Sequence, residues 1–106
     1  MKKLMSILKN LFSTPFERGL ERARSDKDGV LLDVRTRDEY AAGHIPGAVN
    51  IPLDDIDYAD IDSGKTYYVY CLSGARSSAA CRMLAQDGIR AENIGGISGY
   101  RGKTEK

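Results

Sequence analysis

The chain has 106 residues, of which 42% are apolar and 29% are charged, and its formal net charge is +1. This length is typical of one domain that buries a modest core without disulfide bonds. The almost balanced charge argues against a protein that binds nucleic acid over a broad surface, so any anion must be recognised locally. No stretch of the sequence is apolar for long enough to span a bilayer.

The N-terminal part predicts helices. Apolar residues recur at helical spacing at Leu4, Ile7, Leu8 and Leu11, while Lys9 and Asn10 interrupt the run that a signal peptide requires. We expect residues 1–24 to be a helical segment that packs on the domain rather than on a membrane, because amphipathic helices usually cover their own core. Its second helix is expected to start at Thr14 and to bury Phe16, Leu20 and Ala23.

Short apolar runs then alternate with helical patterns. Residues 30–34 are almost continuously apolar, which is typical of a strand buried on both faces. Residues 36–42 predict a short helix, because Thr36 and Glu39 have the spacing of a capping box. A turn over residues 44–47 is expected to follow.

The second half of the chain continues this alternation. We expect a short strand over residues 48–51, a helix or turn within the acidic stretch 53–62, and a strand over 66–70. A helix is predicted over 77–86 and a last strand over 89–94, after which Gly95 and Gly96 are expected to turn the chain.

Strands that alternate with helices predict an α/β fold with a small, mainly parallel sheet flanked by helices. The domain itself is expected to span residues 25–102, followed by a polar tail over residues 103–106.

The two cysteines, Cys71 and Cys81, limit the redox and metal chemistry of the chain. They do not form a C-x-x-C pair, and with His44 they supply only three soft metal ligands. We therefore expect neither a structural zinc site nor a disulfide. Free thiols suit a reducing compartment, so we expect the protein to be cytoplasmic.

Cys71 ends the strand predicted over residues 66–70 and precedes a glycine-containing loop and a helix. In open α/β sheets, sites lie at the carboxyl ends of strands. A helix N-terminus there offers unpaired N–H groups and a partial positive charge, and successive loop amides form an anion-binding nest. A cysteine in this position is expected to have a lowered pKa. We therefore predict that Cys71 is a thiolate nucleophile rather than a small buried apolar residue.

The loop after Cys71 supplies the candidate binding residues, which are Leu72, Ser73, Gly74, Ala75, Arg76 and Ser77. Ser73 and Ser77 add hydroxyl donors, and Gly74 allows the backbone to approach closely. Arg76 adds a fixed positive charge that can form two hydrogen bonds with an oxyanion.

At these residues the chain resembles the rhodanese family of sulfurtransferases. The family's first signature is similar to LLDVR (residues 31–35), Glu39-Tyr40 and GHIPGAVNIP (residues 43–52). Its active-site loop is similar to YVYC (residues 68–71) followed by Gly74, Arg76 and Ser77. Gly95 and Gly96 match a glycine pair near the family's C-terminus, and Tyr100 stands where the family usually has tryptophan. The resemblance covers residues 29–101.

The resemblance implies a rhodanese-like fold and a covalent mechanism. The Cys71 thiolate would take the outer sulfur of a small anionic donor such as thiosulfate, hold it as a persulfide, and pass it to cyanide or to a thiol, including a thiol on an acceptor protein. The amides of residues 72–76 would bind the donor and stabilise the persulfide, and no metal or other cofactor is needed. Many family members begin with an edge strand, whereas this chain begins with a helical pattern, so we expect four or five strands.

The length of the loop distinguishes a sulfurtransferase from phosphatases and arsenate reductases with similar loops. The loop has six residues from Cys71 through Arg76, which fits the sulfurtransferase branch. Rhodanese-fold phosphatases and arsenate reductases carry one residue more, and tyrosine phosphatases need five residues between cysteine and arginine. A phosphatase or arsenate reductase is therefore disfavoured. The other alternative is a sulfur-carrier or protein-interaction module without turnover, and the presence of Cys71 favours the enzyme over it.

Other residues near the predicted site have simpler expected roles. Asp33 and Arg35 follow the first strand and are expected to form a structural charge pair, with orientation of the loop or contact with substrate as the alternative. His44 is expected to be a hydrogen-bonded structural residue rather than a general base. Cys81 is expected to be half-buried on its helix rather than to act as a resolving thiol, and Tyr100 to shape the rim of the site.

Overall fold

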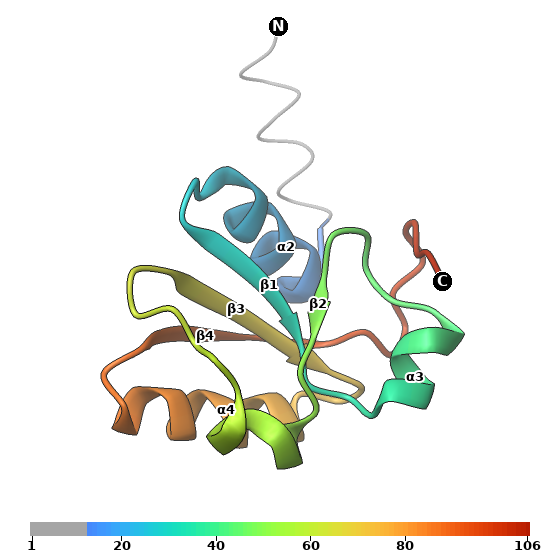
Figure 1. Cartoon of the computed structure of the whole chain (residues 1–106). Helices are drawn as coiled ribbons and strands as arrows, with labels where there is room; N and C mark the ends of the chain where they lie inside the picture. The colour runs from blue at the N-terminus through green and yellow to red at the C-terminus, as the bar shows by residue number, and fades with distance from the viewer. Residues whose placement is uncertain (1–12) are drawn as a thin grey trace, which may run out of the picture.

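Residues 13–106 are described in the structure, which is a computed structural model. The amphipathic helix predicted around residues 4–11 lies outside the described residues. The described chain forms one sheet with α2 on one face and α4 on the other, so the predicted α/β class is confirmed (Figure 1). Of the described helices, none is long and apolar enough to cross a membrane.

The sheet has four parallel strands in the order β2-β1-β3-β4. The elements in chain order are α2 (Pro15–Ser25), β1 (Gly29–Asp33), α3 (Arg37–Ala42), β2 (Val49–Asn50), the 3-10 helix η1 (Leu53–Tyr58), β3 (Thr66–Cys71), α4 (Ala75–Gln86) and β4 (Arg90–Gly96). All the helices and strands predicted for the described residues are present, with different bounds at several ends. Because the strands are parallel, their carboxyl ends share one edge, where α3 and the start of α4 also lie (Figure 1).

The last strand and the last helix have bounds that differ from the sequence prediction. Gly95 and Gly96 do not turn the chain but continue β4, where they pair with Tyr70 and Cys71. A register shift between Val69 and Tyr70, together with a φ of 107° at Gly95, lets the strand run on past a bulge. The helix predicted from residue 77 begins instead at Ala75.

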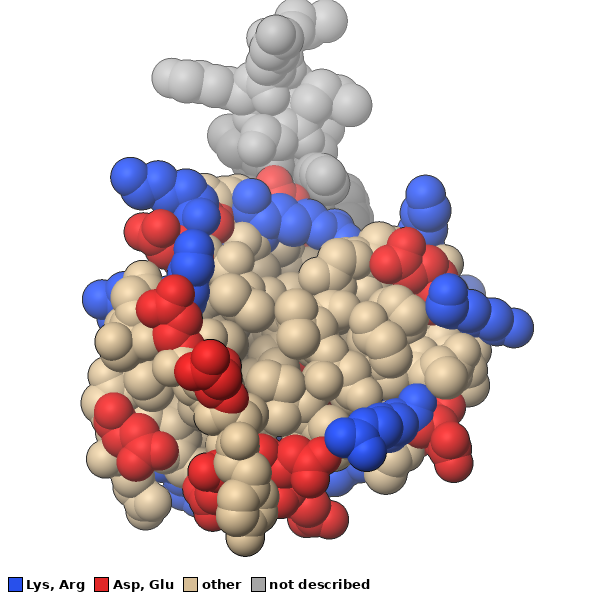
Figure 2. Space-filling view, viewed as in Figure 1, with Lys and Arg blue, Asp and Glu red and all other residues tan. Residues whose placement is uncertain are grey.

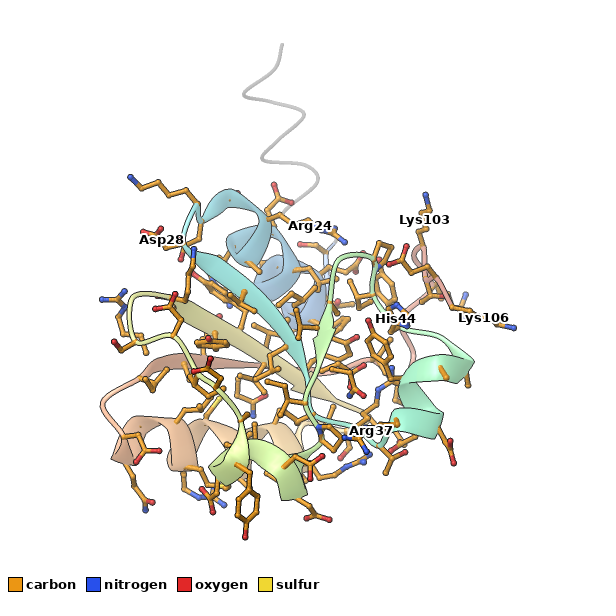
Figure 3. All side chains as sticks on the ribbon, viewed as in Figure 1. Arg24, Asp28, Arg37, His44, Lys103 and Lys106 are labelled. Atoms are coloured by element: carbon orange, nitrogen blue, oxygen red, sulfur yellow. The ribbon has the colours of Figure 1, made fainter. Side chains whose placement is uncertain are left out.

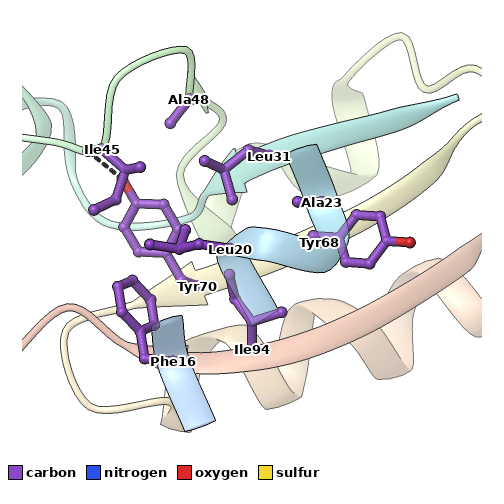
Figure 4. Close-up of a cluster of buried hydrophobic side chains, with 9 residues drawn as sticks. All are labelled: Phe16, Leu20, Ala23, Leu31, Ile45, Ala48, Tyr68, Tyr70 and Ile94. Atoms are coloured by element: carbon purple, nitrogen blue, oxygen red, sulfur yellow. Dashed lines mark hydrogen bonds between the residues drawn. The ribbon is translucent and has the colours of Figure 1, made fainter. Parts of the chain in front are cut away.

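The side chains of β3 alternate between two cores, one on each face of the sheet. Tyr68 and Tyr70 point into the core that α2 covers, together with Phe16, Leu20, Ala23, Leu31, Ile45, Ala48 and Ile94 (Figure 4). Tyr67, Val69 and Cys71 belong to the core on the α4 face. The strand is therefore buried on both faces, as the run of β-branched and aromatic residues predicts.

Two capping boxes begin α2 and α3. At α2, the Thr14 hydroxyl accepts from the N–H of Glu17, and the Glu17 carboxylate accepts from the N–H of Thr14. Thr36 and Glu39 form the same reciprocal contact at α3, as predicted. The predicted boundary after residue 24 falls inside α2, whose buried face belongs to the same core as β1 and β3.

The C-terminal segment is hydrogen-bonded to the turn that contains His44. Glu105 forms two backbone hydrogen bonds with His44, of 2.9 and 2.8 Å (Figure 3 shows His44 beside this segment). On the face shown in Figure 2, Lys and Arg side chains are interspersed with Asp and Glu, as expected for a chain with a net charge of +1.

Candidate active site

Cys71 is the last residue of β3 and lies under the loop that leads into α4. Only 1% of the residue is exposed. The loop is held from one side by the segment after β4, since the N–H of Ile97 donates to the Cys71 carbonyl (2.9 Å) and the N–H of Ser98 to the Leu72 carbonyl (3.0 Å). Gly74 caps α4 with a φ of 103°, a conformation that favours glycine.

The loop turns its hydrogen-bond donors toward the sulfur of Cys71. The N–H of Gly74 donates to Sγ at 3.0 Å, and the Ser77 hydroxyl lies 3.5 Å from Sγ. Burial raises the pKa of the thiol, whereas hydrogen bonds from the Ser77 hydroxyl and from the N–H groups of Ser77, Gly74 and Ser73 lower it, and the net effect is a lowered pKa. This arrangement is the amide nest expected at the helix N-terminus, and it favours the thiolate.

Ser77 is fully buried and connects Cys71 to Asn93, a residue of β4 that the sequence patterns did not single out. Its hydroxyl lies 2.7 Å from Oδ1 of Asn93 and 3.0 Å from the carbonyl of Gly74. Oδ1 also accepts from the N–H of Gly95 (3.0 Å), and Nδ2 of Asn93 donates to the Gly74 carbonyl (3.1 Å). Asn93 therefore holds the Ser77 hydroxyl and the carbonyl of Gly74, whose N–H contacts the sulfur.

The guanidinium of Arg76 is paired with Glu39. Its two terminal nitrogens donate to the two carboxylate oxygens of Glu39, at 2.7 and 3.0 Å. The hydrogen bonds from Arg76 lower the pKa of Glu39 from 4.5 to about 2, so this carboxylate is ionised at neutral pH. The two hydrogen bonds that Arg76 was expected to form with a bound oxyanion are therefore formed with Glu39. The sequence pattern around Glu39 predicted only its role in the cap of α3.

The remaining loop residues, Leu72, Ser73 and Ala75, are exposed, and Gly74 is half-buried. The loop thus combines exposed small or apolar side chains with backbone amides that face inward. Its chemistry rests on peptide dipoles and one hydroxyl rather than on an unpaired cation.

Asp33 and Arg35 form a buried ion pair, with 0% and 7% of their side chains exposed. Nε and one terminal nitrogen of Arg35 donate to the Asp33 carboxylate at 2.7–3.1 Å, and that terminal nitrogen also donates to the Gly43 carbonyl at 2.8 Å. These contacts tie β1 to the end of α3. They support the structural interpretation of the pair over direct contact with substrate.

His44, Cys81 and Tyr100 lie away from the sulfur or are held by other groups. His44 is buried, stacks on Tyr40 with ring centroids 3.6 Å apart, and places Nδ1 2.8 Å from the Tyr40 carbonyl. Burial raises the pKa of the half-buried Cys81 to about 11, which makes it a poor nucleophile. Tyr100 packs edge-on against Phe16 and lines a cavity of about 560 Å³ together with Gly96 and the start of α2. Within residues 13–106, no group of three acidic, His or Cys side chains is arranged to hold a metal.

Comparisons with known proteins agree with this architecture. The family model described as the rhodanese-like domain matches residues 18–103. The chain is 40% identical over 81 residues to a sulfurtransferase of Allochromatium vinosum, a match covering 73% of this chain and 76% of the relative. It is 43% identical over 65 residues to the tRNA sulfurtransferase of Thermoplasma acidophilum, covering 61% of this chain but only 13% of that protein. The crystal structure of a rhodanese-like domain protein from Staphylococcus aureus matches with a TM-score of 0.65 and 36% identity, covering 74% of this chain and 80% of that one.

Proposed function

The chain belongs to the rhodanese-like domain family of sulfurtransferases, and from this premise we propose that it transfers sulfane sulfur through a persulfide on Cys71. The observation that carries the proposal is the hydrogen bonding of Sγ, which accepts from the Gly74 N–H at 3.0 Å beneath a loop of inward-facing amides. A thiol in this environment is ionised more readily than a free cysteine and needs no separate base.

The reaction consists of two displacements on sulfur. The Cys71 thiolate attacks the outer sulfur of the donor, an S–S bond forms, and the donor's own bond to that sulfur breaks with its electron pair, leaving sulfite when the donor is thiosulfate. A cyanide ion or a thiolate then attacks the outer sulfur of the persulfide. This step produces thiocyanate or a new persulfide and returns the Cys71 thiolate.

The loop amides explain why the intermediate would persist between the two steps. The terminal sulfur of a persulfide is anionic, and it would extend from Sγ into the nest formed by Ser73, Gly74 and Ser77. Fixed peptide dipoles stabilise such a charge without reorganising. The partners of the reaction would be a small anionic donor and a thiol acceptor, including a thiol on another protein, in the reducing cytoplasm where Cys71 and Cys81 stay free.

The proposal is tested by loading and discharge of the protein. Incubation with thiosulfate or with a small-molecule persulfide is expected to add the mass of one sulfur atom, which peptide mapping by mass spectrometry places on Cys71. Cyanide is then expected to remove it as thiocyanate. The Cys81→Ser variant should behave like the native protein, and the Cys71→Ser variant should not be loaded.

Each other outcome has a definite meaning. No adduct with either donor, or an adduct that persists in Cys71→Ser, contradicts the persulfide mechanism. An adduct that neither cyanide nor small thiols remove contradicts catalytic turnover and supports the sulfur-carrier alternative. Rapid hydrolysis of an aryl phosphate that depends on Cys71 would favour a phosphatase over a sulfurtransferase.

A further inference from the structure

The loop from Cys71 to Ser77 carries a single charged side chain, Arg76, and the structure pairs it with Glu39. The two side chains are 34% and 30% exposed, so the pair lies at the surface of the loop rather than in the core. Glu39 is itself held in place, because the carboxylate oxygen nearest Arg76 also accepts from the Thr36 N–H at 3.0 Å. The positive charge of the loop is therefore cancelled by a carboxylate that α3 fixes beside it.

This cancellation changes which anions the loop can hold. A nest of peptide N–H groups offers partial charges only, and the ion pair adds almost no net charge to it. The free energy needed to remove an anion from water grows steeply with its charge. The attraction of a site without net charge for the anion grows less steeply, so it does not offset this cost for a second charge. A nest without a free cation therefore favours a neutral or singly charged ligand over a doubly charged one.

We propose that Glu39 is a specificity-determining residue, which neutralises Arg76 so that the site selects the persulfide of an organic thiol over a dianion such as thiosulfate. This inference rests on the proposed sulfurtransferase function. The outer surface of the loop fits such a donor, since Leu72 is 46% exposed and adjoins the nest without adding charge.

The reaction with this donor is balanced without an oxidant or reductant. The Cys71 thiolate attacks the terminal sulfur of the donor persulfide R–S–SH, the bond between Cys71 and that sulfur forms, and the donor's S–S bond breaks. The thiolate R–S⁻ leaves with the electron pair, and the proton of the donor persulfide passes to it or to water. The Cys71 persulfide is the other product.

The test is the variant Glu39→Gln, which keeps an oxygen to accept from the Thr36 N–H, removes the negative charge and replaces one of the two oxygens that accept from Arg76 with an NH2 group. The rate at which Cys71 gains sulfur is measured by mass spectrometry with two donors, thiosulfate and the persulfide of 2-mercaptoethanol. We expect the native protein to react at least about tenfold faster with the persulfide. In Glu39→Gln, the freed charge of Arg76 should accelerate loading from thiosulfate by about three- to tenfold, and loading from the persulfide by less than about twofold. High salt should reduce the gain with thiosulfate.

Asp62→Asn is the matched control. It removes one negative charge at the opposite end of β3, and its amide oxygen can still accept from the N–H of Gly64, as Asp62 does at 2.8 Å. The carbonyl of Asp28 accepts from the N–H of Thr66 at this end of β3, and Figure 3 shows Asp28 on the opposite side of the molecule from Arg37, the first residue of α3. We expect less than about a twofold change with either donor, because charges separated by more than the screening length interact weakly.

Two results would overturn the inference while leaving the sulfurtransferase proposal intact. One is a native protein that loads from thiosulfate as fast as from the persulfide. The other is a Glu39→Gln variant whose loading from thiosulfate is unchanged, or is raised no more than in Asp62→Asn. Failure of both donors to load the native protein would instead overturn the proposed function itself.

Discussion

The hydroxyl of Ser77 lies 2.7 Å from the amide oxygen of Asn93, and this contact determines where the single proton of that hydroxyl points. The orientation of the Asn93 amide follows from its backbone partners, since the Gly95 N–H can only donate and the Gly74 carbonyl can only accept. Ser77 donates to Asn93 while Cys71 is a thiol. When Cys71 ionises, the hydroxyl is free to rotate toward Sγ, 3.5 Å away.

Replacing Ser77 with alanine should raise the pKa of Cys71. The hydrogen bond from the Ser77 hydroxyl makes the largest contribution among those that lower this pKa, so its loss should move the pKa up. The rate of alkylation by iodoacetamide, followed against pH, measures the shift. The same rate profile in both proteins would contradict this role for Ser77.

Asn93→Ala tests how Asn93 acts on the proton of the Ser77 hydroxyl. We expect the pKa of Cys71 to fall, because Asn93 competes with Sγ for this proton, and its loss leaves only the Gly74 carbonyl, at 3.0 Å, as a competing acceptor. In the Ser77→Ala background the effect of Asn93→Ala should shrink, since the two residues act partly through one hydrogen bond. Fully additive shifts would show that Asn93 does not act through Ser77.

The elements and the position of Cys71 at the end of β3 were predictable from the sequence because their signals are local. The apolar run of β1, the capping box of Thr36 and Glu39, and the strand that ends at Cys71 each depend on neighbours a few residues apart. These local patterns are reproduced in the structure because packing on both faces of the sheet reinforces them.

The partners of the loop were not predictable, because they come from distant parts of the chain. Glu39 satisfies the local cap of α3, and nothing in that pattern indicates Arg76, which is 37 positions away. Asn93 lies within a strand pattern, and only the pairing of β4 with β3 brings it to Ser77. The pair Gly95-Gly96 predicts a turn, but it lies in β4, because sequence alone does not distinguish a bulged strand from a turn at two glycines.

The pairing of Glu39 with Arg76 should make stability depend on pH in the acid range. The folded protein holds the pKa of Glu39 near 2, below its ordinary value of 4.5, mainly through the hydrogen bonds from Arg76. The contribution is therefore complete above pH 4.5 and is lost as pH falls from 4.5 through 2. Urea unfolding should show that Glu39→Gln is less stable than the native protein at neutral pH and that the difference closes toward pH 2. A difference that stays constant with pH would contradict the ion pair.

The buried pair of Asp33 and Arg35 should matter for stability far more than an exposed pair. Arg35→Met leaves the Asp33 carboxylate buried without its charge partner, and we expect a loss of about 3–5 kcal/mol in the free energy of unfolding. Arg37→Gln breaks the pair with Asp55, in which the arginine side chain is 81% exposed, and should cost about 0–1 kcal/mol. Urea denaturation measures both. Equal losses in the two variants would contradict a structural role for Asp33 and Arg35.

Cys81 should not take part in sulfur transfer. Burial raises the pKa of its thiol to about 11, whereas the pKa of Cys71 is lowered, so Cys71 ionises more readily than Cys81. Limited alkylation at pH 7 should therefore modify Cys71 and spare Cys81, as mapped by mass spectrometry. Comparable labelling of the two thiols at early times would show that Cys81 is more reactive than its environment indicates.

Gly96 should be required for the shape of the loop from Cys71 to Ser77. A Cβ atom at this position would lie 2.2 Å from the Leu72 carbonyl oxygen and 2.7 Å from Cα of Ser73, and both are backbone atoms that cannot move without moving the loop. Gly96→Ala is therefore expected to slow sulfur loading of Cys71 by at least about tenfold and to raise its pKa, because the amides no longer converge on Sγ. Loading by mass spectrometry and the pH profile of alkylation report these two effects.

Gly29→Ala separates a loss of loop geometry from a loss of stability. A Cβ at Gly29, the first residue of β1, would lie 2.8 Å from the carbonyl oxygen of Ala23 in α2, so the substitution overpacks the protein at the edge of the sheet opposite the loop. It should lower the free energy of unfolding by about 1–3 kcal/mol and leave the pKa of Cys71 unchanged in the folded protein. If Gly96→Ala merely reproduced this result, with reduced stability and normal loading, the close approach of β4 to the loop would not govern the reactivity of Cys71.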